Sequence, residues 1–324
     1  GYRRLGDEPF IKHCPAPLEP AFQLEEHGTG TPDDQERVYT HYLHRRILKK
    51  TWKQFKSSAV SCFSFVESFG MSYVPQLIMD TLGFNTLKKP DPNLAPRLET
   101  APANEDVSTH SMPPTPGPQG LTREYQMTLA LRMLKQLGLT RDFAPWVVLC
   151  GHGSTVQNTP YQAAYQCGAC CGHSGAPNAL AAAKILNTPE VRHDLMKEGI
   201  QIPENTFFLA GLHDTTRDAI HLLNAQEVPN ERLSDLRNWI ESARQETLKE
   251  RARAMQCSVK QLLRRSSDWS EVRPEWGLAG NASFIIGKRS HSYKKDLEGR
   301  TFLHRYHHED DSDGQILESI MTAP

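Results

Sequence analysis

Two short apolar runs, each ending in polar residues, constrain the fold of this chain more than any other feature. The first, WVVLC, covers residues 146–150 and leads into a glycine turn that holds His152; the second, TFFLAGLHD, covers residues 206–214 and contains His213. The stretch between them has the spacing of two helices separated by a break at Pro189. Strand, loop, helix and strand in this order predict a parallel α/β sheet, in which functional residues gather at the carboxyl ends of the strands. We therefore expect both histidines at one edge of the sheet.

Local sequence signals predict a further helix and a further strand. Thr122 is a candidate N-cap for a helix that Gly138 would end. The apolar residues at 282–287, ASFIIG, predict another strand near the end of the chain.

Composition excludes several classes of protein. The 324 residues carry 37 Lys and Arg against 38 Asp and Glu, so the near-zero net charge gives no reason to expect nucleic acid as a partner. No run of about 18 apolar residues occurs, and the first residues lack the apolar core of a signal peptide. The seven cysteines include the adjacent pair Cys170 and Cys171, which is a poor basis for a disulfide framework. We expect a soluble or peripheral protein with free thiols in a reducing compartment.

The chain divides into three regions. Residues 1–87 are predicted to be mainly helical, with a stretch over 36–82 whose apolar residues recur every three to four positions, opposite a face rich in Lys and Arg. This basic face is either a solvated surface or a contact for an anionic membrane or an acidic partner. Residues 88–120 are rich in proline and predict a linker or surface excursion. Residues 121–324 are predicted to hold the α/β core, with a helical insertion near 220–263.

A cluster of thiols and imidazoles follows the first strand. His152 stands between two glycines, and Cys167 comes fifteen residues later. Thiolate and imidazole suit Zn²⁺, but a stable site needs three or four protein ligands. Cys170, Cys171 and His173 are local candidates to complete it, although consecutive side chains seldom point at one ion.

Two other interpretations of these cysteines stay open. Cys167 and Cys170 have Cys-x-x-Cys spacing, which at a helix N-terminus would lower the pKa of the first thiol and suit redox chemistry. Cys150, at the end of the first strand, is expected to be a small buried side chain and not a ligand.

Several motifs together resemble the DabA family. They are CGHGS followed by CGAC and an Ala-rich helix, then GIQIPENTFFLAGLHDTTRD, and finally DWSEVRPEWGLAGNASFII. The resemblance runs over nearly the whole chain. Members of this family are zinc-containing subunits of an inorganic carbon transporter and are distantly similar to β-carbonic anhydrases. It implies an α/β fold whose sheet is like that of β-carbonic anhydrases, with parallel strands flanked by helices, helical insertions, and only part of a domain in this chain.

The resemblance also implies a set of zinc ligands. The family holds zinc with two cysteines, one aspartate and one histidine, and its motifs match His152 and Cys167 here. The other two ligands belong to a Cys-x-Asp-x-Arg element that this sequence lacks. Cys62 is the nearest candidate, but Ser64 and Val66 stand where Asp and Arg are needed. The sequence starts without Met and resembles a C-terminal portion of a family member, so we expect a truncated chain that binds zinc poorly and has no hydration activity by itself.

The function implied by the resemblance is energy-coupled transport of inorganic carbon. Zinc in the intact subunit would promote hydration of CO₂ to bicarbonate, driven in one direction by a cation gradient through a membrane subunit, DabB. The subunit would then lie peripherally on the cytoplasmic face of the inner membrane. The alternative is a zinc-binding or thiol-redox scaffold without catalytic activity.

His213 is a candidate group for proton transfer beside this zinc. An imidazole at the edge of the sheet has a pKa suited to moving the proton released in hydration, and the neighbouring Asp214 could fix its tautomer. The alternative is a structural histidine that hydrogen-bonds the turn after the strand.

Overall fold

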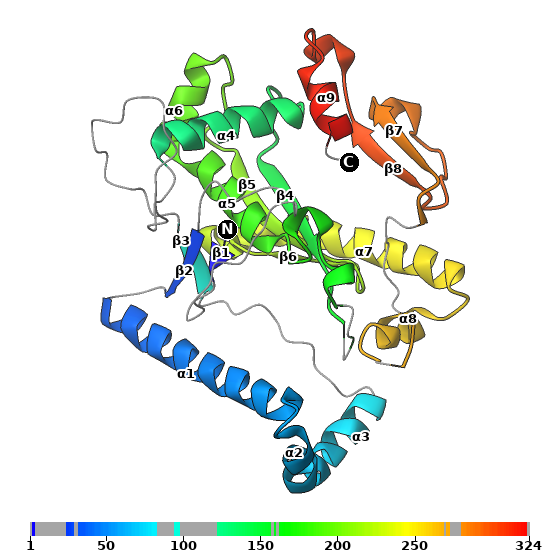
Figure 1. Ribbon diagram of the computed structural model, residues 1–324. Helices are drawn as coiled ribbons and strands as arrows, with labels where there is room; N and C mark the ends of the chain where they lie inside the picture. Colours follow the sequence, from blue (N-terminus) through cyan, green and yellow to red (C-terminus); the bar gives the residue numbers. More distant parts are fainter. Residues whose placement is uncertain are drawn as a thin grey trace.

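The sheet expected from the two apolar runs is present in the computed structural model (Figure 1). β4 (Trp146–Gly153) and β5 (Phe207–Asp214) run parallel, and β6 (Ala219–Leu222) pairs antiparallel with the end of β5. The register sets His152 opposite His213. The prediction of two neighbouring parallel strands with both histidines at one edge is confirmed, and the protein is a mixed α/β structure.

The structure describes residues 2–3, 24–28, 32–82, 94–97, 122–156, 159, 162–268, 270–272 and 280–322. The linker predicted over 88–120 lies outside these residues, apart from 94–97. Most of the RPEWGLAGN block lies outside them as well.

The two faces of the sheet are covered by different parts of the chain. Val147 and Leu149 point toward three helices and join a core that includes Phe208. Trp146 and Val148 point the other way, toward the segment that leads into α7. Apolar residues on both faces are typical of a strand buried in a parallel sheet. The three helices on the first face are α4 (Arg123–Gln136), α5 (Ala176–Asn187) and α6 (Pro189–Lys197).

The boundaries of these helices follow the predicted signals. The Thr122 hydroxyl accepts a hydrogen bond from the backbone N–H of Tyr125 at 3.3 Å, as an N-cap should. Gly138, just beyond the end of α4, has a φ of 62°, which glycine adopts without strain. Pro189 occupies the first turn of α6, so that α5 and α6 are separate helices.

Helix α5 is fastened to the sheet at both ends. At its N-terminus the backbone N–H of Gly175 donates to the carbonyl of His152 at 2.8 Å. At its C-terminus the side-chain amide of Asn187 donates to the carbonyl of Phe208 at 2.8 Å and accepts from the N–H of the same residue at 2.9 Å. The helix therefore bridges the end of β4 and the beginning of β5.

The N-terminal helices project away from this core (Figure 1). The stretch predicted to be helical forms separate helices because serine hydroxyls hydrogen-bond to backbone carbonyl groups near the end of the first helix. Ser57 donates to the carbonyl of Lys53 at 2.7 Å, and Ser61 donates to that of Phe55 at 2.8 Å. The elements of this region are α1 (Pro32–Ser57), α2 (Cys62–Phe69), η1 (Gly70–Tyr73), α3 (Val74–Leu82) and a small sheet of β1 (Tyr2–Arg3), β2 (Leu24–Gly28) and β3 (Leu94–Arg97).

The C-terminal part is more varied than the predicted helical insertion. The residues at 219–222 form β6, and short turns of 3₁₀-helix precede the long helix. The strand predicted at ASFIIG is confirmed. The elements are η4 (Ala225–Glu227), η5 (Asn230–Leu233), α7 (Ser234–Ala254), α8 (Val259–Arg265), the parallel pair β7 (Ser283–Gly287) and β8 (Thr301–Arg305), and α9 (Gln315–Thr322).

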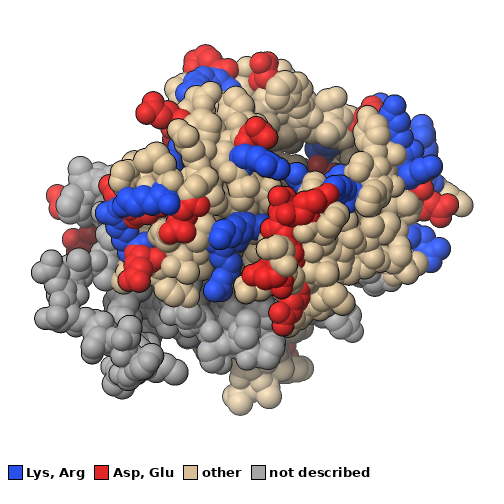
Figure 2. Space-filling view, turned by 90° about the horizontal axis from the view of Figure 1, so that it is seen from above, with Lys and Arg blue, Asp and Glu red and all other residues tan. Residues whose placement is uncertain are grey.

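The surface agrees with the balanced composition. Over much of the face in Figure 2, basic and acidic side chains are interspersed, as the near-zero net charge predicts. In the part of the chain that the structure describes, every helix is too short or too polar to span a lipid bilayer.

Candidate metal centre

The carboxyl ends of β4 and β5 carry three chemically active side chains on one face. Residues paired across parallel strands project to the same side, so His152 and His213 share a face of the sheet. Cys150 lies on this face too, with its sulfur over Gly211: a Cβ on that glycine would meet the sulfur at 3.2 Å. The opposite face at this point is occupied by the segment before α5.

Cys150 is a poor candidate for a metal ligand. We expected it to be buried, but the residue is exposed. The sulfur itself lies against Gly211 and is partly shielded from water, and this desolvation raises the pKa of the thiol. A hydrogen bond from the backbone N–H of His213 only partly offsets the effect. A metal ion would therefore have to displace a more tightly held proton at Cys150 than at Cys167.

Cys167 sits in a tight loop that returns to the sheet. Its backbone N–H donates to the carbonyl of His173 at 3.1 Å, closing a loop between these two residues. The next turn is left-handed at two consecutive positions, with φ of 56° at Cys171 and 74° at Gly172. A Cβ at Gly172 would lie 3.1 Å from the Cβ of Ala163, so the sequence needs glycine there. This loop buries Cys167 beneath the surface.

The thiol of Cys167 has a pKa lowered to about 6. The largest cause is a hydrogen bond from the side chain of Cys170. The charge of His152 and two backbone N–H groups also lower the pKa, whereas burial of the thiol raises it. The side-chain amide of Asn178 in turn donates to the sulfur of Cys170 at 3.3 Å. At neutral pH Cys167 is mainly a thiolate, which is the form that binds metals and attacks electrophiles.

Of the predicted ligands, His152 lies near enough to Cys167 for its charge to lower the pKa of that thiol. In the part of the chain that the structure describes, no three His, Cys, Asp or Glu side chains are arranged to hold a metal ion. The local candidates Cys170, Cys171 and His173 therefore do not complete a site with His152 and Cys167. That the two donor atoms lie about 3 to 4.5 Å apart, as zinc bonds would require, stays a prediction.

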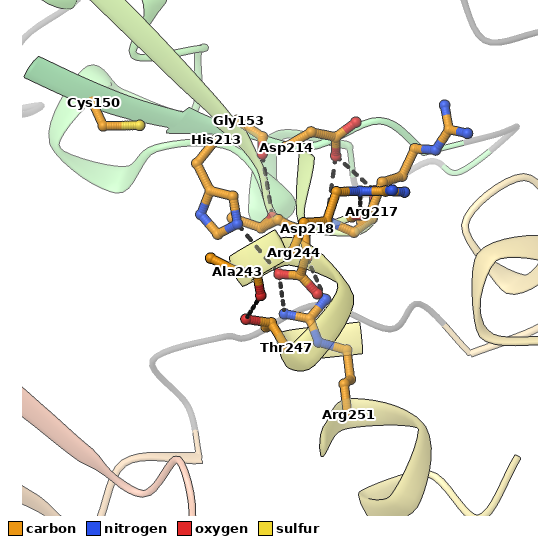
Figure 3. Close-up of polar contacts among 12 residues, drawn as sticks. Cys150, Gly153, His213, Asp214, Arg217, Asp218, Ala243, Arg244, Thr247 and Arg251 are labelled. Carbon is orange, nitrogen blue, oxygen red and sulfur yellow. Dashed lines mark hydrogen bonds and ion pairs between the residues drawn. The ribbon is translucent and has the colours of Figure 1, made fainter. Parts of the chain in front are cut away.

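His213 belongs to a polar chain that continues into α7 (Figure 3). Its Nε2 lies 3.3 Å from Oδ1 of Asp218, and the same oxygen lies 3.0 Å from Nη2 of Arg251. Asp218 and Arg251 are each 3 % exposed in their side chains, whereas His213 is 33 % exposed. Nη1 of Arg251 also donates to the carbonyl of Thr215 at 2.6 Å. The partly solvated imidazole of His213 therefore contacts a buried ion pair through Asp218.

The partner of His213 differs from the one that we expected. Asp214 faces the other side of the sheet and accepts hydrogen bonds from the backbone N–H and the hydroxyl of Thr155, at 3.0 and 2.6 Å. It also accepts from the hydroxyl of Thr216 at 2.9 Å. Asp214 therefore ties the loop after β4 to the turn after β5, and Asp218 orients the histidine.

Sequence reasoning missed Arg251 and Asp218. Arg251 looked like one more charge in a solvated helix, and only the packing of α7 against the turn buries it. Asp218 has a φ of 51°, a conformation that Asp tolerates better than most residues, but the sequence alone does not reveal it.

The side chains at this edge of the sheet include donors of the type that zinc prefers, a thiol and an imidazole. The second imidazole, that of His213, is hydrogen-bonded to a carboxylate and partly open to solvent, an arrangement typical of groups that act in general acid–base catalysis.

Comparisons with known proteins identify the family to which the whole chain is similar. The family described as "Probable inorganic carbon transporter subunit DabA" matches residues 1–324. The chain is 40 % identical over 333 residues to "Probable inorganic carbon transporter subunit DabA2" of Halothiobacillus neapolitanus, covering 100 % of this chain and 39 % of that protein. It is 39 % identical to DabA of Chloroflexus aurantiacus and to DabA 2 of Bradyrhizobium sp., each over 96 % of this chain and 38 % of the relative. The chain thus spans less than two fifths of the length of these relatives. No solved structure matches.

Proposed function

Because the chain belongs to the DabA family of probable inorganic carbon transporter subunits, we propose that it is the section of such a subunit that supplies His152 and Cys167 to a zinc centre for CO₂ hydration. The observation that carries the proposal is the buried loop that returns Cys167 to the end of β4, close enough to His152 for its charge to help lower the pKa of the thiol to about 6. A structural thiol buried among apolar groups would instead have a raised pKa.

The residues present fit zinc by their chemistry. One thiolate and one imidazole are two of the four donors that a closed site needs, and the other two would come from the Cys-x-Asp-x-Arg element elsewhere in the subunit. Bound zinc would supply a Lewis acid that activates water for addition to CO₂ near neutral pH.

The other two ligands would enter the sheet beside β4. Among the described residues, β4 pairs only with β5, although Val147 and Val148 pack on opposite faces in the manner of a central strand. We propose that a further parallel strand, carrying the Cys-x-Asp-x-Arg element, pairs with the open edge of β4. The completed sheet would then be like that of β-carbonic anhydrases.

His213 is the proposed proton carrier. Hydration of CO₂ releases a proton, and the imidazole of His213 would take it up while its hydrogen bond with Asp218 holds the ring in place. Because the ring is about one third exposed, it can pass the proton to solvent. The buried ion pair with Arg251 holds Asp218 in place.

Transport and localisation extend this proposal to the whole subunit. Net uptake of carbon needs a driving force, which a membrane partner, DabB, would supply by coupling proton removal to a cation gradient. The subunit would lie peripherally at the cytoplasmic face of the inner membrane.

The test uses the full-length subunit together with its membrane partner. His152→Ala and Cys167→Ser should each abolish bound zinc, measured by plasma mass spectrometry, and uptake of labelled inorganic carbon. Cys150→Ser is the matched control, since this thiol is on the same edge but holds its proton more tightly than Cys167 does. Full zinc occupancy in either ligand variant would refute the assignment.

A thiol-redox scaffold is kept as the second candidate, because Cys170 hydrogen-bonds the lowered-pKa thiol of Cys167. Cys170→Ser distinguishes the two functions: zinc and carbon uptake should persist if Cys167 is a ligand. A scaffold that works through a Cys167–Cys170 disulfide would lose its function in this variant.

A further inference from the structure

A chain of hydrogen bonds connects Cys167 with the first turn of α5. The thiol of Cys170 donates to the sulfur of Cys167, and the side-chain amide of Asn178 donates to the sulfur of Cys170 at 3.3 Å. Asn178 belongs to α5, and the residue before this helix is held to the carbonyl of His152. Each donor in this chain of bonds therefore points toward Cys167, one of the two proposed zinc ligands.

The local fold places Cys170 beside Cys167. The backbone N–H of Cys170 donates to the carbonyl of Cys167 at 3.1 Å, and that of Gly172 donates to the same carbonyl at 3.0 Å. Residues three apart in such a tight turn bring their side chains to the same side. Cys170 and Cys167 are 4 and 7 % exposed, so the hydrogen bond between their sulfurs is shielded from water, where it is stronger than in solvent.

Cys170 is suited to donate a hydrogen bond and not to bind the metal itself. A thiol has one proton to donate, and its sulfur is a weak acceptor. Because the sulfur of Cys170 accepts from the amide of Asn178, its proton is directed to the sulfur of Cys167. Among the described residues, Cys170 is also not part of any group of three side chains arranged to hold a metal ion.

We propose that Cys170, oriented by Asn178, is a positioning residue that holds the zinc-binding sulfur of Cys167 in place and weakens its donation of charge to the metal. The inference rests on the proposed zinc centre and gives a role to a thiol that is not one of its ligands. A hydrogen bond to a metal-bound sulfur withdraws electron density from the metal–sulfur bond, which makes the metal a stronger Lewis acid. Residues that hydrogen-bond metal ligands in this way typically contribute about 10–100-fold to metal affinity or activity.

Cobalt(II) in place of zinc tests the proposal in the full-length subunit with its membrane partner, because a cobalt–thiolate bond gives a charge-transfer band in the near ultraviolet. Cys170→Ala removes the donor, so this band should move to longer wavelength. The dissociation constant for zinc, measured by competition with a chromophoric chelator, should rise about tenfold or more. Cys170→Ser keeps a donor and should restore both values. Asn178→Leu leaves both thiols in place and should move the band in the same direction as Cys170→Ala, by a smaller amount.

Cys171→Ala is the matched control, because this neighbouring thiol is only partly buried, and the variant should change neither the band nor the affinity. Circular dichroism checks that each variant is folded, and Asn178→Leu tests the same bonds if Cys170→Ala does not fold.

The outcomes separate this inference from the proposed function. An unchanged band and affinity in Cys170→Ala and Asn178→Leu would overturn the inference and leave the zinc assignment intact. A Cys170→Ser variant that behaves like Cys170→Ala would also overturn it, since packing or direct binding of the metal by Cys170 would then explain the effect. Absence of a thiolate band in the unmodified subunit would overturn the zinc assignment and this inference with it.

Discussion

The buried pair of Arg251 and Asp218 gives the sharpest test of how the site is supported. We consider Arg251→Met, which keeps much of the volume of the side chain but removes its charge. The variant leaves the carboxylate of Asp218, 3 % exposed, without its buried cation. It also removes the donor to the carbonyl of Thr215.

The expected loss of stability follows from these two effects. Removing one partner of a buried ion pair costs about 3–5 kcal/mol, because the other charge stays desolvated and uncompensated. The lost hydrogen bond to the carbonyl adds about 1 kcal/mol. The free energy of unfolding should therefore fall by about 4–6 kcal/mol. The exposed pair of Arg123 and Asp194 is the control: Arg123 is 55 % exposed, and Arg123→Met should cost about 1 kcal/mol or less.

Urea unfolding at pH 7, followed by circular dichroism, measures both variants. Arg251→Met/Asp218→Ala should recover part of the stability that Arg251→Met loses, since no uncompensated charge remains. A loss below about 1.5 kcal/mol in the single variant, or a double variant that is less stable than the single one, would refute the reasoning.

Three further predictions concern the strands and loops of the site. Alkylation of Cys167 by iodoacetamide should rise with pH around a midpoint of about 6, because its pKa is lowered, and Cys170→Ala should shift the midpoint upward; a wild-type midpoint near 9 contradicts this. Gly151→Ala should destabilise by about 1–3 kcal/mol in thermal unfolding, since its Cβ would lie 2.6 Å from a backbone oxygen, whereas Gly168→Ala, with open space, should change little. His213→Ala in the partnered full-length subunit should keep zinc but depress carbon uptake; loss of zinc would make it a ligand.

The strands and helices of the core could be predicted because their signals are local. The apolar run before His152 and the run through His213 are each long enough to define a strand, and the helical stretch between them requires a parallel crossover. Thr122 and Gly138 mark the ends of α4 through side-chain and backbone chemistry that depends on a few neighbours only.

The residues that hold His213 in place could not be predicted, because their positions depend on packing between distant segments of the chain. Asp218 and Asp214 are both plausible partners for His213 in the sequence, and only the alternation of side chains across the sheet separates them. Arg251 is buried because α7 lies against the turn after β5, a contact that no local pattern encodes. The strand β6 could not be predicted from local sequence either, because it forms by pairing with β5.

The double attachment of α5 has a mechanical consequence. The helix of 12 residues is about 18 Å long and stiff along its axis, and it joins the carbonyl of His152 on β4 to the backbone of Phe208 on β5. Sliding one strand along the other would have to stretch or compress this helix, so α5 resists shear between the strands in the way that a diagonal brace stiffens a frame. The alignment of His152 with His213 is then held against slippage by a strut on the far face of the sheet, at no cost in space on the face where the two imidazoles lie.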